Sequence, residues 1–173
     1  MKKYKLGLVL GRFQVFHKGH ESIIDTAIEN CEKVLIFIGS SDKKDTYENP
    51  FDYEFRANII KTIYDNPNII IAPLADLGVG NVPKWGNYVI NKAIDIIGMP
   101  DCIIYGIEEK CEHWYKDYPD INFIKVDRGE IDISSTKLKD IILNGNYDEY
   151  IKYVNPKISI YYDEIKNKLK SLK

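Results

Sequence analysis

Two histidines stand three residues apart in a short run near the start of the chain. The run reads Gly11-Arg12-Phe13-Gln14-Val15-Phe16-His17-Lys18-Gly19-His20 and follows an apolar stretch. If a helix begins near Lys18, His17 and His20 lie about one turn apart and can project toward one point. Gly19 removes a side chain where a phosphate would approach the backbone, and a helix start offers free amide donors and partial positive charge. The run therefore predicts a turn that binds phosphate and assists substitution at phosphorus by positioning and charge neutralisation.

Other interpretations of the histidine pair stay open at this point. Histidines at this spacing are common, and most of them are ordinary surface or capping residues. A zinc site is less favoured, because no third histidine and no suitable cysteine or carboxylate cluster lies nearby in the sequence. We therefore expect no resident metal.

A second polar segment lies far downstream, where Ile133-Ser134-Ser135-Thr136-Lys137-Leu138-Lys139 begins a predicted helix. Its apolar residues Leu138, Ile141 and Ile142 are spaced for core packing. Hydroxyl groups at a helix start, with lysines close by, make a cradle for phosphate groups. Ser-Ser-Thr before a helix is also an ordinary N-cap, so this segment alone is not specific.

Apolar runs alternate with amphipathic segments along the whole chain. We expect strands at 4–10, 33–38, 68–73, 101–105 and 121–126, and helices at 18–30, about 52–64, from about 84, about 135–144 and about 157–172. The third helix should turn Val89, Ala93, Ile96 and Ile97 inward. This order predicts an α/β, Rossmann-like, doubly wound parallel sheet of five to six strands with helices on both faces. In such sheets ligands gather at the carboxyl ends of the strands, where the histidine run lies.

Length and composition favour an ordinary globular protein. The 173 residues predict one domain, residues 1–173, with a helical C-terminal segment from about 146 to 173 packed on it. A net charge of −2 argues against broad binding to nucleic acid, and no apolar run is long enough to span a membrane. Cys31, Cys102 and Cys111 form no CxxC pair, so we expect reduced thiols in a cytoplasmic protein.

Taken together, the two polar segments resemble the paired signatures of the HxGH nucleotidyltransferase superfamily. The resemblance implies that His17 and His20 contact the α-phosphate of a nucleoside triphosphate, with Gly11, Arg12, Phe13 and Gly19 beside them. It places Ser134, Ser135, Thr136 and Lys139 at the β- and γ-phosphates. The chain departs from the pattern at Lys139, where the family usually has Arg, and at Val15, where it often has Pro. Lysine keeps the charge but loses the planar fork that contacts phosphate through two bonds.

Within that superfamily the chain is most similar to the archaeal-type nicotinamide mononucleotide adenylyltransferases. The similarity lies in Gly39-Ser40, in Thr46-Tyr47-Glu48-Asn49-Pro50-Phe51, and in Glu54 with Arg56. It implies that Ser40, Arg56, Asp76, Asn81 and Trp85 bind the mononucleotide, although the spacing around Asp76 and Asn81 is about two residues longer than the family's. An indole such as that of Trp85 can stack on a pyridinium ring. Gly106 falls in the adenine-binding loop.

The implied activity joins ATP, with Mg²⁺, to nicotinamide mononucleotide and gives NAD and pyrophosphate. The resemblance also implies a homo-oligomer. Two alternatives stay open. One is cytidylyl or adenylyl transfer to another phosphorylated acceptor, and the other is a non-catalytic module that senses nucleotides on the same fold. Tolerance for nicotinic acid mononucleotide and the effect of Lys139 are not determined by the sequence.

Overall fold

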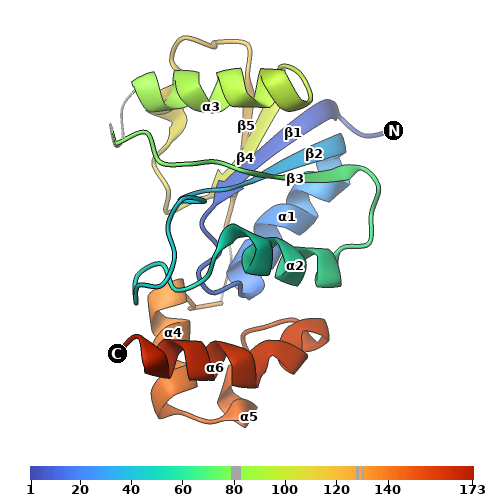
Figure 1. The fold of residues 1–173 in the computed structure, drawn as a ribbon. Helices are drawn as coiled ribbons and strands as arrows, with labels where there is room; N and C mark the ends of the chain where they lie inside the picture. The colour runs from blue at the N-terminus through green and yellow to red at the C-terminus, as the bar shows by residue number, and fades with distance from the viewer. Residues whose placement is uncertain (79–82, 128, 130) are drawn as a thin grey trace.

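A computed structural model describes residues 1–78, 83–127, 129 and 131–173. Its centre is a five-stranded parallel sheet with strand order β3-β2-β1-β4-β5 (Figure 1). The strands are β1 (Tyr4–Gly11), β2 (Cys31–Ile38), β3 (Ile69–Pro73), β4 (Cys102–Gly106) and β5 (Asn122–Val126). The chain builds outward from β1 in one direction through β2 and β3, and then in the other through β4 and β5. The predicted doubly wound parallel sheet is confirmed, with five strands.

Helices cover both faces of this sheet. The helices α1 (Lys18–Asn30) and α2 (Tyr53–Ile63) lie on one face, and α3 (Pro83–Ile96) lies on the other (Figure 1). Two apolar clusters result, because the strands are apolar throughout and bury side chains on both faces. Ile24 and Ile60 belong to the cluster under α1 and α2, whereas Leu35 and Val89 belong to the cluster under α3.

The C-terminal residues form a third layer beneath α1 and α2 (Figure 1). It consists of α4 (Ser135–Asn144), the short α5 (Tyr147–Tyr150), a 3-10 turn η2 (Pro156–Tyr161) and α6 (Tyr162–Ser171). Leu138, Tyr150 and Ile165 are fully buried and belong to the same cluster as the residues under α1. This packing fixes the start of α4 against the rest of the fold.

Two expected helices differ in detail. The inward stripe of α3 is Gly86, Val89, Ile90 and Ala93, whereas Ile96 is 45% exposed, because the helix ends there and the chain turns at Gly98 with φ +123°. The single helix expected at 157–172 is divided. Asn155 caps a 3-10 turn that begins with Pro156, and α6 starts only at Tyr162. Proline suits the first turn of a helix, so the turn begins one residue before the predicted start.

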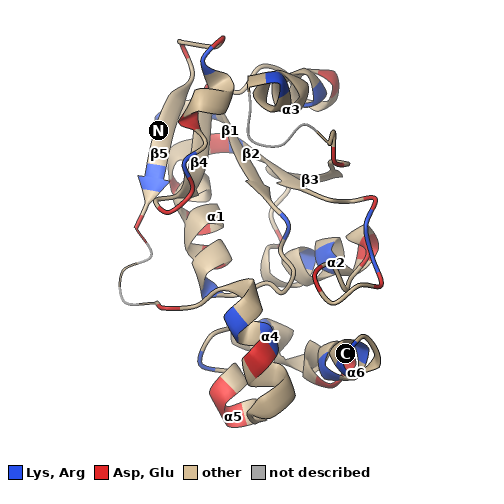
Figure 2. Ribbon diagram, turned by 90° about the vertical axis from the view of Figure 1, so that its left-hand side faces the viewer, with Lys and Arg blue, Asp and Glu red and all other residues tan. Residues whose placement is uncertain are grey.

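The rest of the described chain adds little that bears on the site. Cys31, Cys102 and Cys111 are buried free thiols. Figure 2 shows Lys and Arg interspersed with Asp and Glu over the ribbon. In the described residues, no helix has both the length and the apolar character needed to cross a bilayer.

Candidate active site

A cavity of about 540 Å³ opens at the carboxyl ends of β1 and β4. Its polar walls include Gly11, Arg12, His20, Ser40, Glu48, Asp76, Ser135, Thr136 and Lys139, and its aromatic walls include Phe13, Trp85, Tyr105, Trp114 and Tyr115. The cavity therefore lies at the edge of the sheet where the two directions of winding part, as expected for a ligand site in such a fold. Most of the predicted site residues border it.

The two histidines form a hydrogen-bonded pair at the start of α1. His17 is the N-cap and accepts a hydrogen bond at Nδ1 from the Gly19 amide at 3.0 Å. The His17 amide donates to Nδ1 of His20 at 3.2 Å, and the two rings stack with centroids 3.8 Å apart. Because each Nδ1 accepts a bond, the neutral rings carry their protons on Nε2. In that state Nε2 is the donor atom of each ring.

The two histidines differ in their access to the cavity. His20 borders it, whereas His17 is 2% exposed and is not among the residues that line it. The capping interpretation is therefore correct for His17, and it is compatible with a ligand role for His20. Gly19 is buried inside α1, and its amide is engaged by His17. The role of Gly19 beside a phosphate stays a prediction, in which it contributes the absence of a side chain and not its amide.

Phe13 shapes the turn between β1 and α1. Its backbone lies in the left-handed region at φ +55°, and its ring meets the His20 ring edge-on at 4.9 Å. A Cβ added at Gly11 would lie 2.8 Å from the Phe13 ring, so glycine permits this packing. The chain thereby turns sharply after β1 and places both Arg12 and His20 on the cavity wall.

The second polar segment meets the histidine turn directly. Ser135 Oγ donates to the Val15 carbonyl oxygen at 3.1 Å, across 120 residues of sequence. Ser134 caps α4 by accepting from the Lys137 amide, whereas Ser135 and Thr136 border the cavity. The structure therefore brings the two signatures to one site, with Ser134 acting as the cap behind it.

Lys139 is buried, with 5% exposure, although it borders the cavity. Its Nζ donates to the carbonyl oxygens of Tyr47 at 2.8 Å and Glu48 at 3.0 Å, in the loop between β2 and α2. Burial lowers the pKa of Lys139, Arg12 lowers it further, and Glu48 opposes them. Lys139, which stands where the family usually has Arg, thus anchors the loop between β2 and α2. Arg12, in turn, pairs with Glu48 at the cavity wall at 3.5 Å.

Arg56 lies beneath the cavity. It is 1% exposed and is not among the lining residues, in contrast to its expected contact with a mononucleotide. Its guanidinium donates to four carbonyl oxygens, those of Arg12, Gly39, Ser40 and Asp52. Burial lowers the pKa of Arg56 to about 10. This side chain ties the ends of β1 and β2 together.

Another part of the cavity wall is formed by Ser40, Asp76 and Trp85. Ser40 sits at φ +49° and donates through Oγ to Asp76 Oδ1 at 3.0 Å, and Lys43 pairs with Asp76 at 2.8 Å. Burial alone would raise the pKa of Asp76, but the hydrogen bonds from Lys43 and Ser40 outweigh it and lower that pKa. Asn81 lies outside the described residues.

Other residues complete or adjust the expected set. Gly106 ends β4 but does not border the cavity, and its neighbour Tyr105 does. Sequence reasoning gave no role to Trp114, which reaches the wall because the 3-10 turn η1 (Glu112–Tyr115) packs tightly on α3. A Cβ at Gly86 would lie 1.9 Å from the Trp114 carbonyl oxygen, so Gly86 is the one local signal of this contact. Among the described residues, no group of three His, Cys, Asp or Glu side chains could hold a metal ion.

A model of the cytidylyltransferase-like family matches residues 8–141, which include both polar segments. The chain belongs to the cytidylyltransferase-like family. The expected relation to the nucleotidyltransferases is therefore confirmed, and the match ends just after Lys139 in α4.

This cytidylyltransferase-like chain is similar in sequence to two archaeal proteins and in structure to a bacterial one. A nicotinamide-nucleotide adenylyltransferase of Saccharolobus solfataricus is 28% identical over 153 residues, which cover 84% of each chain. One of Methanococcus aeolicus is 32% identical over 108 residues, or 60% of this chain and 61% of that protein. Among solved structures, a bifunctional NMN adenylyltransferase/ADP ribose pyrophosphatase of Francisella tularensis is 26% identical, with a TM-score of 0.80 over 98% of this chain. This chain spans about half, 52%, of the Francisella protein.

Proposed function

We propose that the chain transfers the adenylyl group of ATP to nicotinamide mononucleotide and releases NAD and pyrophosphate. The observation that carries this proposal is the meeting of the histidine turn with the start of α4 at one cavity, through the bond from Ser135 to Val15. The names of the Saccharolobus and Methanococcus relatives support the reaction and the acceptor.

The chemistry requires no nucleophile from the protein. A 5′-phosphate oxygen of the mononucleotide attacks the α-phosphorus in line, the bond to the bridging oxygen breaks, and pyrophosphate leaves with the electron pair. The protein supplies orientation and charge neutralisation. His20 would donate from Nε2 to an α-phosphate oxygen, Arg12 would neutralise charge beside it, and His17 would hold the His20 ring from behind.

The β- and γ-phosphates would lie at the start of α4. Ser135, Thr136 and the amides of its first turn provide donors, and the helix end provides partial positive charge. Lys139 adds a full charge close by. Its ammonium group has three donors, and two of them bind loop carbonyls, so one is left for a phosphate.

The mononucleotide would lie on the wall formed by Ser40, Asp76 and Trp85. Trp85 can stack on the positively charged pyridinium ring, worth about 1–2 kcal/mol when desolvated. Arg56 would support this wall through the backbone of Ser40, and a contact from Asn81 stays a prediction. Mg²⁺ would enter as the complex with ATP and neutralise the triphosphate; one structure of the Francisella protein contains AMP and a manganese ion.

The decisive experiment measures pyrophosphate release from ATP or CTP with a set of phosphorylated acceptors. Release that requires both ATP and nicotinamide mononucleotide supports the proposal. Release with CTP or with another acceptor would replace it by the sister chemistry, and nucleotide binding without turnover would indicate a sensor. His20→Ala should lower kcat by about 10²-fold or more while the protein stays folded. A normal rate in that variant would refute the role of His20.

Two further expectations accompany this proposal. We propose that residues 1–173 act as one unit and that the chain forms a homo-oligomer. Sedimentation velocity at micromolar concentration, with the monomer mass of 20.1 kDa as reference, tests the second of these.

A further inference from the structure

Gln14 is a buried polar residue of the histidine turn for which the reaction gives no task. It is 3% exposed, and its side-chain amide pairs with the backbone of a single residue. Nε2 donates to the Phe51 carbonyl oxygen at 2.9 Å, and the Phe51 amide donates to Oε1 at 3.0 Å. The side chain thus bonds to both the amide and the carbonyl group of Phe51, as the backbone of a neighbouring β-strand would. It joins segments that are 37 residues apart in the sequence.

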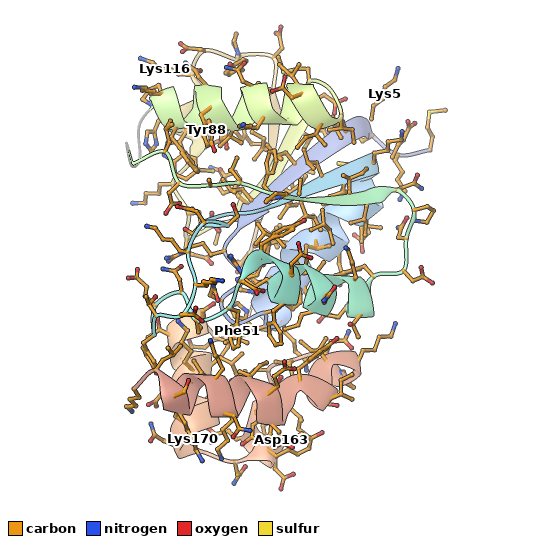
Figure 3. All side chains as sticks on the ribbon, in the orientation of Figure 1. Lys5, Phe51, Tyr88, Lys116, Asp163 and Lys170 are labelled. Atoms are coloured by element: carbon orange, nitrogen blue, oxygen red, sulfur yellow. The ribbon has the colours of Figure 1, made fainter. Side chains whose placement is uncertain are left out.

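Phe51 stands near the end of the β2–α2 loop, which we define as residues 39–52. It is 5% exposed, and its ring stacks on Phe55 with centroids 4.6 Å apart. Figure 3 shows Phe51 beside α2, on the side of the C-terminal helices. This end of the loop is therefore firmly held, and the hydrogen bonds from Gln14 connect it to the histidine turn.

The same loop carries several groups of the cavity. Ser40 and Glu48 line it, and the carbonyl oxygens of Tyr47 and Glu48 are the partners of Lys139. The start of the loop is also held to the turn, by the bond from the Gly39 amide to the Gly11 carbonyl oxygen and by Arg56. Among the described residues of the loop beyond Ser40, loss of the two bonds to Phe51 would leave the pair of Arg12 and Glu48, whose side chains are 55% and 77% exposed, as the hydrogen-bonded link to the turn. Exposed ion pairs contribute little to stability, so this pair alone would hold that part of the loop weakly.

We propose that Gln14 is a positioning residue that holds the β2–α2 loop against the histidine turn and so keeps the nucleotide cavity assembled. Its effect on turnover rests on the proposed function, but its effect on the loop does not. In the alternative, the hydrogen bonds of Gln14 only satisfy its buried amide. Substitution of Gln14 would then lower the stability of the protein without opening the loop.

The first test compares Gln14→Met with a matched control. Methionine keeps the length of the side chain but makes neither hydrogen bond. Lys43 and Lys44 provide trypsin sites within the loop, so cleavage there in the absence of substrates reports its opening. We expect cleavage to be roughly tenfold faster and kcat/KM for ATP to be roughly tenfold lower, as expected for the loss of two buried hydrogen bonds.

The control is Tyr161→Phe, which removes a hydrogen bond of 2.9 Å to Thr62, between η2 and α2 and outside the cavity. It should lower the unfolding midpoint in urea yet leave loop cleavage and the KM for ATP at wild-type values. If Gln14→Met matches this control, with lower stability alone, the proposal is overturned.

The second test uses Gln14→Glu, which has the same shape. A protonated carboxyl group has one donor and one acceptor, as Phe51 requires, whereas the ionised form lacks the donor. Position 14 is buried, and burial raises the pKa of a carboxyl group above its ordinary value of about 4.3. Relative to wild type at the same pH, loop cleavage should therefore be near normal at about pH 5.5 and roughly tenfold faster at about pH 8. A ratio that does not change with pH overturns the proposal, even if Gln14→Met fails to fold.

These readouts separate the two proposals. Faster loop cleavage in Gln14→Met would support the role of Gln14 whatever the activity. If the wild-type protein then shows no pyrophosphate release with nicotinamide mononucleotide, the proposed function is refuted and the role of Gln14 stands. Pyrophosphate release at the wild-type rate from Gln14→Met would refute the role of Gln14 and leave the function standing.

Discussion

Arg56→Met should be among the most destabilising substitutions at this site. Methionine has a similar reach but cannot replace the four hydrogen bonds that the guanidinium donates to carbonyl oxygens. Three of those acceptors belong to Arg12, Gly39 and Ser40, where the chain leaves β1 and β2. Each buried acceptor left unpaired costs about 1–3 kcal/mol. Part of this is recovered, because the variant no longer buries a charge.

The balance gives an expected loss of about 3–5 kcal/mol in the free energy of unfolding. For a domain of this size, that corresponds to a fall of roughly 6–20 °C in Tm. Arg56→Lys should lose less than Arg56→Met, since an ammonium group keeps some of the bonds but cannot span all four carbonyls. Urea denaturation of the three proteins measures these differences.

Arg12→Met is the matched control for stability. It removes a guanidinium whose ion pair with Glu48 is largely exposed, so the free energy of unfolding should change by less than about 1 kcal/mol. A loss below about 1 kcal/mol in Arg56→Met would mean that the burial of its charge cancels its hydrogen bonds. That result would refute the claim that Arg56 ties the two strand ends together.

Three further predictions concern packing and charge. Gly11→Ala places a Cβ 2.8 Å from the ring of Phe13, which must move, so we expect a loss of about 1–3 kcal/mol in urea denaturation and a lower kcat/KM. Gly86→Ala meets the Trp114 carbonyl at 1.9 Å, where backbone must shift, so the loss should be larger, about 3 kcal/mol or more; equal losses in the two variants would contradict this. For Asp76, whose pKa is lowered, the ionised form stabilises the fold above the ordinary value of 3.8, and this contribution is lost as pH falls through the lower folded pKa. The stability difference between wild type and Asp76→Asn should therefore be constant from about pH 5 to 7 and shrink under acid, and a difference that grows there would refute the assignment.

The sequence was sufficient where periodicity and burial coincide. The range 18–30 predicted for the first helix matches α1, because Ile23, Ile24 and Ala27 are buried at helical spacing. It was insufficient at Ile96, where the apolar pattern continues but the helix ends. The 3-10 turn at Pro156–Tyr161 was also missed, because its residues have the spacing of a helix and only the Asn155-Pro156 pair marks the change.

For the site, residue types and motifs predicted which segments border the cavity better than they predicted the contacts of individual side chains. Ser135 and His20 border the cavity as expected, since each stands at the start of a helix that points there. Gln14 and Trp114 could not be found in this way. Their positions depend on Phe51 and Gly86, which are 37 and 28 residues away along the chain, and one sequence does not display such pairings.

His17, Arg56 and Lys139 share a property that changes how mutations at this site should be interpreted. Each belongs to a segment whose resemblance implies contact with a nucleotide, yet each has hydrogen bonds here with backbone groups. Because backbone amides and carbonyls shape the cavity, loss of activity at any of the three follows equally from lost contact with a nucleotide or from a displaced wall. Only the second cause lowers the free energy of unfolding of the empty protein. Activity and stability must therefore be measured on the same variants before any of these residues is assigned to a bound nucleotide.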